Sequence, residues 1–353
     1  MNRVAVIMAG GSGERFWPAS RLRRPKQLLR LADPERTLLE QAVARIAPLV
    51  GPENVIVATG APIRDAIVEA NLVPEGNVWA EPSKKNTLGC LSWAAANFEA
   101  GGKNPTWAVL TADHSISDEE AFRKCVEIAF SAAEQTGGLV TFGIPPSRPD
   151  TGFGYIEVGE AAGPGVSNVV RFHEKPDEIT AREYLRASRF LWNSGMFFWT
   201  QDAFLRELNA HRPGVFGLIR ALAEAIRAGD GARAAEVFEA HPSESVDYAL
   251  MENTRSAYVV RATFGWDDLG AWDSLRRSLP LDSAGNAFVG DVLSLESRNN
   301  VVYAEIEGLK VCLLGVEDLV LAVTPDALLL TTAQRSQDVR KIVEELKKRG
   351  GPV

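Results

Sequence analysis

Glycine and basic residues gather in one short stretch near the amino terminus, directly after an apolar run over residues 4–9. Residues 1–30 contain seven Arg and Lys residues and one acid, while the whole chain carries a net charge of −8. Glycines let backbone N–H groups turn toward a ligand, and Arg15 and Lys26 supply positive charge beside them. This combination predicts a loop that binds a polyphosphate, with a solvated basic turn as the alternative. The loop residues are Gly10, Gly11, Ser12 and Gly13.

The loop matches neither of the two common nucleotide-binding motifs. A dinucleotide-binding fingerprint needs a third glycine where Phe16 stands, which disfavours an NAD-dependent oxidoreductase. A P-loop needs Ser or Thr after its Gly-Lys pair, but Asn104 follows Gly102-Lys103. The phosphate loop must therefore belong to another class.

Two aspartates stand where a metal-dependent site could form. Asp113 follows the apolar run 107–111, and ligands of open α/β sheets bind beyond the carboxyl ends of the strands. Asp268 lies in an aromatic and glycine-rich turn over 265–270, next to Asp267. Two carboxylates meeting at a nucleotide suit Mg²⁺, which prefers oxygen ligands and substrate phosphates. Spacing alone does not pair them, and a helix cap or loop role for Asp113 stays open.

Several blocks of the sequence together resemble one family. The run Gly-Gly-Ser-Gly-Glu-Arg-Phe-Trp-Pro-Ala-Ser over 10–20, followed by Arg-Pro-Lys-Gln at 24–27, resembles the signature of sugar-1-phosphate nucleotidylyltransferases. Its specific form is similar to that of the mannose-1-phosphate guanylyltransferases. Glu14 departs from the pattern, because many relatives carry Thr there. The resemblance continues through blocks at 81–87, 111–114, 151–156, 172–176, 192–197 and 266–270.

The resemblance implies transfer of GMP from GTP to α-D-mannose 1-phosphate, giving GDP-mannose and pyrophosphate. The sugar phosphate is already ionised, so it attacks the α-phosphorus in line without a protein nucleophile, and catalysis is positioning plus charge neutralisation. The resemblance assigns Mg²⁺ to Asp113 and Asp268, the latter preferred over Asp267 because it fills the family's x-Asp-x-Gly position. Arg15 and Lys26 would stabilise the departing pyrophosphate.

The sugar side is expected around three later blocks. The resemblance assigns Glu174 to sugar hydroxyls and Lys175 to the sugar phosphate; a surface ion pair of little worth is the alternative. Asn193 both donates and accepts hydrogen bonds, which suits a hydroxyl. Gly154 would allow close backbone contact with the sugar.

The nucleobase has one candidate partner. Glu81 could accept from both N1–H and N2–H₂ of guanine, because an ionised carboxylate is acceptor-only; the alternative is a helix-start or salt-bridge residue. Asn86 and Thr87 would touch the nucleoside or cap the following helix. Another sugar 1-phosphate or nucleotide remains an alternative substrate, and a non-catalytic relative that binds nucleotide sugar remains an alternative function.

Apolar runs alternate with helical patterns from residue 4 to residue 143, which predicts a sheet covered by helices on both faces. The fold class expected is α/β, with a Rossmann-like, mixed but mostly parallel sheet of the nucleotide-diphospho-sugar transferase type. A β insertion is expected over 155–172. The domain is expected to span residues 1–280.

A second, smaller domain is expected over residues 285–353. Short strand-like runs from 287 to 330 show no helical period. The resemblance implies a left-handed β-helix there, which in the family often mediates dimers. An amphipathic helix over 334–349 follows. Longer relatives carry a fused cupin-type isomerase domain, for which we expect no room in 353 residues.

The composition fits a soluble globular protein with a sizeable core. Hydrophobic residues make up 46% and charged residues 24% of the chain, which excludes a mostly disordered chain and a disulfide scaffold. The acidic balance argues against binding to nucleic acid or a membrane surface, and the absence of a long apolar run predicts a cytoplasmic protein. The homodimer is what the family resemblance implies. Cys90, Cys125 and Cys312 show no C-x-x-C spacing, so we expect buried small hydrophobes, with one reactive thiol as the alternative.

Overall fold

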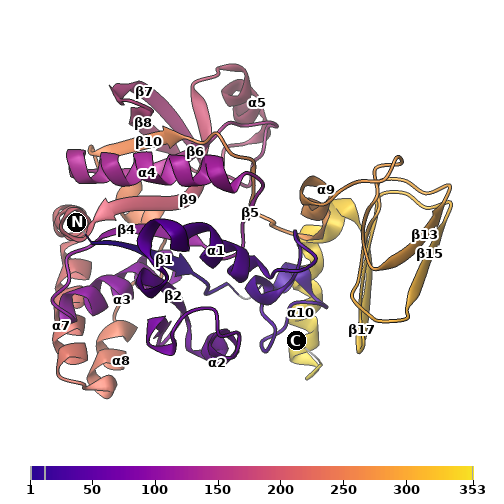
Figure 1. The fold of residues 1–353 in the computed structure, drawn as a ribbon, viewed down its shortest axis with the longest axis horizontal. Coiled ribbons are helices and arrows are strands. Elements are labelled where there is room, and N and C mark those ends of the chain that lie inside the picture. Colours follow the sequence, from indigo (N-terminus) through magenta and orange to yellow (C-terminus); the bar gives the residue numbers. More distant parts are fainter. Residues whose placement is uncertain (1, 12, 352) are drawn as a thin grey trace.

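The computed structural model describes residues 2–11, 13–351 and 353. A nine-stranded sheet forms its centre, in the order β3-β2-β1-β4-β9-β6-β10-β8-β7 (Figure 1). Strands β8 and β9 run opposite to the other seven, which confirms the mixed, mostly parallel sheet. The strands are β1 (Arg3–Met8), β2 (Val55–Gly60), β3 (Val78–Glu81), β4 (Thr106–Thr111), β6 (Leu139–Ile144), β7 (Tyr155–Gly163), β8 (Val166–His173), β9 (Phe190–Thr200) and β10 (Ala257–Arg261).

Helices cover both faces of this sheet. Along β1, Ala5 and Ile7 pack into one core cluster while Val4 and Val6 pack into the other, because successive strand residues point to opposite faces. Helices α1 and α4 cover the first face, and α3, α6, α7 and α8 cover the second. The helices are α1 (Leu38–Val50), α2 (Arg64–Glu69), α3 (Asn86–Ala100), α4 (Glu119–Thr136), α5 (Glu178–Arg186), α6 (Gln201–His211), α7 (Pro213–Arg227) and α8 (Gly231–Glu239).

The carboxyl-terminal strands form a separate β-helix. The chain passes alternately through two rows, so that β12, β14 and β16 pair in parallel in one row and β13 and β15 in the other. Strand β17 adds to β16 in the antiparallel sense. The β-helix confirms the fold expected here. Its strands are β12 (Ala287–Val289), β13 (Asp291–Leu295), β14 (Val301–Ala304), β15 (Lys310–Leu314), β16 (Leu319–Thr324) and β17 (Ala327–Thr332).

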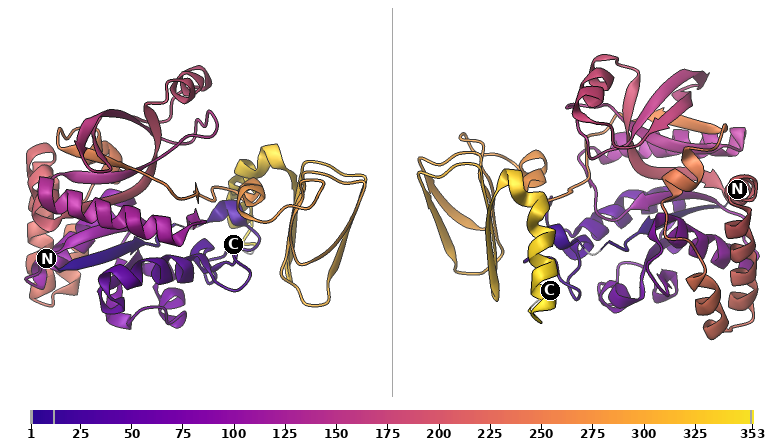
Figure 2. Two further views of the ribbon diagram at one scale, coloured as in Figure 1. Left: turned by 45° about the horizontal axis from the view of Figure 1, so that its top comes forward. Right: turned by 180° about the vertical axis from the view of Figure 1, so that it is seen from behind.

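The last helix, α10 (Val339–Lys348), lies between the β-helix and the central domain (Figure 1 and Figure 2). Val343 of α10 and Tyr303 of β14 belong to the same buried cluster as Phe16 and Trp17, which follow the glycine-rich loop. The Trp272 indole N–H also donates to the Trp17 carbonyl oxygen at 2.9 Å. One apolar core therefore joins the β-helix, the last helix and the amino-terminal loop.

The cysteine interpretation is corrected at one position. Cys90 and Cys125 are buried, but Cys312 is exposed. In β15 the side chain of Val311 points into the β-helix, so that of the next residue, Cys312, points outward. Among the residues that the structure describes, no helix combines the length and hydropathy needed to cross a bilayer.

Candidate functional site

The glycine-rich loop leaves the carboxyl end of β1 and folds back on Lys26. Gly13 adopts φ +62°, and a Cβ there would collide with the Lys26 Cβ, so only glycine fits. Among the described residues, a Cβ built on Gly10 would meet Glu81 Oε1 at 3.8 Å, and one built on Gly11 would meet no atom within 4 Å. Ser12 was expected in this loop and lies outside the described residues.

Two neighbouring cavities meet at this loop. The first, here called the charged cavity, has a volume of about 420 Å³. The second, here called the apolar cavity, has a volume of about 350 Å³ and shares Gly11, Glu14 and Lys84 with the first. The charged cavity is lined by Gly11, Gly13, Glu14, Arg15, Phe16, Lys26, Lys84, Asp113, His114, Asp268, Gly270 and Arg340.

Lys26 ties the two predicted aspartate segments together. Its buried ammonium donates to Asp113 Oδ2 at 2.8 Å and to the Asp268 carbonyl oxygen at 3.2 Å. A two-residue ladder between β5 (Ser115–Ile116) and β11 (Trp266–Asp267) holds these segments side by side. Both carboxylates therefore line the charged cavity, although 155 residues separate them in the chain.

The two carboxylates differ in their readiness to ionise. Burial raises the pKa of Asp113, but attraction by the Lys26 ammonium outweighs it and leaves that pKa below its usual value. Burial, followed by repulsion from Asp267, raises the pKa of Asp268 to about 6. A cation between them would relieve this accumulation of negative charge.

Asp267 has a structural partner of its own. Its carboxylate accepts from the guanidinium of Arg277 and from the backbone N–H of Leu269, the latter at 2.9 Å. Its side chain is buried and does not line the charged cavity, whereas that of Asp268 does. This geometry favours Asp268 over its neighbour as the ligand-facing aspartate.

His114 is a neutral neighbour of the acidic pair. Burial lowers the pKa of its imidazole to about 4. The Trp266 indole N–H donates to His114 Nδ1 at 3.0 Å, so this nitrogen acts as an acceptor. Trp266 thereby fixes the orientation of the ring at the wall of the charged cavity.

Three cations on the charged cavity lack an acidic partner among the described residues: Arg15, Lys84 and Arg340. Within the described part of the chain, the Arg15 guanidinium donates to one acceptor, the Gly270 carbonyl oxygen, at 3.3 Å. Sequence reasoning missed Lys84 and Arg340. Lys84 stands directly before the Lys-Asn-Thr run at 85–87, which was a usable signal, whereas nothing in the sequence connects Arg340 with a loop more than 300 residues away.

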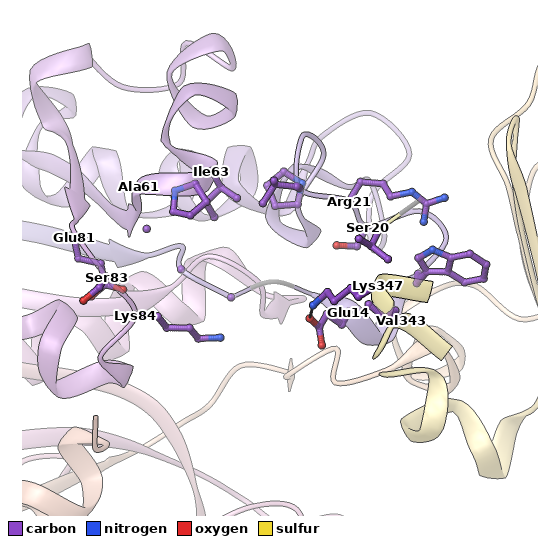
Figure 3. A pocket seen from close by; sticks show the side chains of 18 of the residues that line it. Glu14, Ser20, Arg21, Ala61, Ile63, Glu81, Ser83, Lys84, Val343 and Lys347 are labelled. Atoms are coloured by element: carbon purple, nitrogen blue, oxygen red, sulfur yellow. Dashed lines mark hydrogen bonds and ion pairs between the residues drawn. The ribbon is translucent and has the colours of Figure 1, made fainter. Parts of the chain in front are cut away.

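Glu81 lines the apolar cavity with an unsatisfied carboxylate. The residue is 6% exposed, and its Oε2 atom has no hydrogen-bond partner among the described residues. Burial raises the pKa of Glu81 to about 7, against an opposing effect of the Lys84 ammonium. Figure 3 shows Glu81 at one end of the cavity and Val343 of α10 at the other. A buried, unpaired acceptor of this kind is suited to a ligand that donates hydrogen bonds.

Glu81→Gln is expected to stabilise the ligand-free protein at pH 8 by about 1–3 kcal/mol, and much less at pH 5. Folding raises the pKa of Glu81 from 4.5 to about 7. The stability that the protonated carboxyl contributes to the wild-type protein is therefore fully present below pH 4.5 and is lost as the pH rises through 7. Glutamine never ionises, so it avoids that loss. Thermal melts at both pH values, with exposed Glu69→Gln as the control, measure the difference. An equal effect of Glu81→Gln at the two pH values would contradict the burial argument.

A second polar cluster contains most of the expected sugar-side residues. The Asn193 backbone N–H donates to the Gly154 carbonyl oxygen at 2.8 Å, and its amide donates to Asp247 Oδ1 at 2.6 Å. A Cβ on Gly154 would lie 2.7 Å from Glu174 Oε2, so glycine permits this approach. Burial raises the pKa of Asp247 to about 6. The hydrogen bond from Asn193 opposes this increase, and the negative charge of Glu174 adds to it. Asp247, in a π-helical turn, was not predicted.

Lys175 does not lie on any of the cavities described here. Its ammonium pairs with Glu174 Oε1 at 3.0 Å, and both side chains are exposed. A third cavity of about 380 Å³, lined by Arg15, Asp268 and residues 150–153, connects the charged cavity with the segment that precedes Gly154. The expected sugar-side residues Gly154, Glu174 and Asn193 themselves line none of the three cavities.

Asn86 and Thr87 are the first two residues of α3 and lie apart from these cavities. Asn86 Oδ1 accepts from the Thr87 backbone N–H at 2.8 Å. The Thr87 hydroxyl oxygen accepts from the Val246 backbone N–H at 2.9 Å. Neither contact is a side-chain cap of α3, whose N-cap residue is Lys85, so contact with the nucleoside and helix capping both stay predictions.

Within the described part of the chain, no group of three or more His, Cys, Asp or Glu residues is arranged to hold a metal ion. Two carboxylates on one cavity still fit Mg²⁺, which commonly takes one or two protein carboxylates and completes its shell with water and substrate phosphates. Asp113 and Asp268 supply oxygen donors of the required kind.

Comparison with known proteins agrees with this layout. The Nucleotidyl transferase family model matches residues 4–283, and the MannoseP isomerase/GMP-like beta-helix domain model matches residues 290–346. Mannose-1-phosphate guanylyltransferase of Escherichia coli K12 is 39% identical over 362 residues, covering 98% of this chain and 73% of that protein. The alginate biosynthesis protein AlgA of Pseudomonas aeruginosa PAO1 is 38% identical over 354 residues, with coverage of 98% and 73%. A crystal structure of mannose-1-phosphate geranyltransferase from Thermus thermophilus superposes with a TM-score of 0.88 at 33% identity, covering 98% of this chain and all of that one.

Proposed function

Because the chain belongs to the nucleotidyl transferase family, we propose that it transfers GMP from GTP to α-D-mannose 1-phosphate, giving GDP-mannose and pyrophosphate. The observation that carries this proposal is the charged cavity. There a glycine-rich loop, a buried lysine and two aspartates from distant segments meet, together with three cations that lack acidic partners among the described residues. That set is suited to a triphosphate and a divalent cation.

The phosphate chemistry follows from these charges. The sugar phosphate oxygen attacks the α-phosphorus of GTP in line, and the bond from that phosphorus to the β-phosphate oxygen breaks. Arg15, Lys26 and the loop N–H groups stabilise the charge that develops on the leaving pyrophosphate. Asp113 and Asp268 would hold Mg²⁺, which when bound neutralises phosphate oxygens in the transition state.

The guanine is proposed to occupy the apolar cavity against Glu81. Its N1–H and N2–H₂ groups would donate to the carboxylate, whose Oε2 atom is otherwise unsatisfied among the described residues. Such a partner favours the ionised form of Glu81 and so offsets the burial that raises its pKa. Adenine has no donor at N1 and no amino group at C2, so it would leave the carboxylate unpaired.

The mannose is proposed to bind at the cluster of Gly154, Glu174 and Asn193. Asp247 fixes the Asn193 amide group, and Asn193 Oδ1 accepts from the Gly195 backbone N–H at 3.2 Å and from the Thr141 hydroxyl at 3.4 Å. The Glu174 carboxylate is therefore the main proposed acceptor for sugar hydroxyls. Lys175 would exchange its exposed contact with Glu174 for the sugar phosphate. Such an exchange is inexpensive because exposed ion pairs contribute little stability.

A homodimer through the β-helix is also proposed. Its two-strand row exposes Leu293 and Leu295 on β13 and Leu314 on β15. Exposed apolar side chains gathered on one face are typical of contact surfaces between proteins.

Pyrophosphate release tests the reaction directly. The protein is assayed with GTP, ATP, UTP and dTTP against mannose and glucose 1-phosphates, with Mg²⁺ or with excess EDTA. We expect turnover with GTP and mannose 1-phosphate, a preference over ATP of at least about 100-fold, and loss of turnover in EDTA. Preference for another pair would support a different nucleotidylyltransferase, and nucleotide-sugar binding without pyrophosphate release would support a non-catalytic relative.

A further inference from the structure

The carboxyl-terminal helix packs directly on the glycine-rich loop. Val343 of α10 is 3% exposed and belongs to the same cluster as Phe16 and Trp17. The Lys347 ammonium donates to Glu14 Oε1 at 2.6 Å, across 333 residues of sequence. This contact gives a physical reason for glutamate at position 14, where many relatives of the resembled family carry threonine. The helix is therefore fixed against the loop by an apolar contact and an ion pair.

One face of α10 is directed at the two cavities. Val343 and Lys347 line the apolar cavity, beside Glu14 in Figure 3, and Arg340 lines the charged cavity. These positions are separated by three and four residues, so they share one side of the helix. The adjacent Lys341 instead pairs with Asp338 at 2.7 Å and lines neither cavity.

The charge balance of the cavity leaves Arg340 available for a ligand. Lys26 is paired with Asp113, and Glu14 is paired with Lys347 of the same helix. Arg340 is exposed and forms no ion pair with the residues that the structure describes. A guanidinium with no such partner, facing a cavity that already contains other free cations, is arranged for an anion. Its planar donor fork matches phosphate oxygens in pairs.

We propose that Arg340 binds the β- and γ-phosphates of the nucleoside triphosphate, and hence the pyrophosphate product, so that α10 forms a wall of the active site. This inference rests on the proposed function and extends it, because it assigns phosphate binding to a segment beyond the nucleotidyl transferase match at 4–283. The β-helix then has a role in catalysis, since the helix that follows it carries a substrate-binding side chain.

The test compares Arg340→Gln with Lys341→Gln, which removes the same charge from the next residue of the helix. Binding of inorganic pyrophosphate with Mg²⁺ is measured by calorimetry, and KM is measured separately for GTP and for mannose 1-phosphate. For Arg340→Gln we expect at least about 10-fold weaker pyrophosphate binding and a similar rise in the KM for GTP, the scale of a lost charge-assisted hydrogen bond. The KM for mannose 1-phosphate should stay within about twofold of the wild-type value, a smaller change than the loss of one such hydrogen bond would cause.

Two further measurements keep the outcome decisive. Arg340→Lys keeps the charge and should recover part of the pyrophosphate affinity, and the melting temperature of each ligand-free variant reports any loss of folding. The inference would be overturned if Arg340→Gln bound pyrophosphate as tightly as Lys341→Gln does. It would also be overturned if Arg340→Lys bound pyrophosphate no more tightly than a folded Arg340→Gln protein. A wild-type protein that binds pyrophosphate through Arg340 but releases none from any substrate pair would instead refute the proposed function.

Discussion

Replacing Lys26 by alanine is expected to lower kcat by at least about 100-fold, the scale of a lost electrostatic contact in a transition state. The Lys26 ammonium is buried and bonds both to the Asp113 carboxylate and to the Asp268 backbone. Its removal takes away a cation proposed to meet the leaving pyrophosphate. It also removes the group that keeps the pKa of Asp113 low, so the pair of aspartates loses its organising partner.

Steady-state kinetics with GTP and mannose 1-phosphate measure this effect. Lys124→Ala is a suitable control, because Lys124 makes an exposed ion pair with Glu120 on α4 and should leave turnover unchanged. Lys26→Arg keeps a charge but changes its shape, so it should recover only part of the rate. Near-normal turnover in Lys26→Ala would reject the role assigned to this residue.

Asp268→Asn is expected to lower kcat by about 100-fold or more and to raise the Mg²⁺ concentration that gives half-maximal rate. The free carboxylate already carries a pKa of about 6, because it is buried beside Asp267. Neutralising it relieves that repulsion, so the folded protein should not lose stability at pH 7.5. Activity and stability should therefore separate in this variant.

Asp267→Asn should behave in the opposite way. Asp267 holds Arg277 and the Leu269 N–H, so its neutralisation is expected to destabilise the fold by about 1–3 kcal/mol. At temperatures where both variants are folded, the Mg²⁺ dependence of Asp267→Asn should remain near that of the wild type. If the two variants exchanged these behaviours, Asp267 would be the metal-facing residue.

The inner part of the central sheet could be predicted from sequence because β1, β2, β4 and β6 are buried on both faces and read as continuous apolar runs. The start of α1 was also encoded locally, since Thr37 and Glu40 form a reciprocal capping box at the helix end. Helix α8 (Gly231–Glu239) was not predicted. Its pattern is short and alanine-rich, so burial against α7 decides it more than periodicity does.

The site was harder to predict than the fold because its parts meet through tertiary structure. The pairing of Asp113 with Asp268 depends on a two-residue ladder between β5 and β11, which is too short to leave a periodic signal. Asp247 reaches Asn193 from a π-helical turn, and Arg340 reaches the charged cavity from the last helix. The family motifs named the loop and both aspartates, whereas Lys84, Asp247 and Arg340 become neighbours only through packing.

A crystal structure with a non-hydrolysable GTP analogue and Mg²⁺ tests the arrangement of the site most directly. We expect the β- and γ-phosphates against Gly11, Arg15 and Lys26, with the metal ion between the carboxylates of Asp113 and Asp268 and the α-phosphate. Density for the triphosphate outside the charged cavity, or a metal ion that neither aspartate approaches, would contradict it.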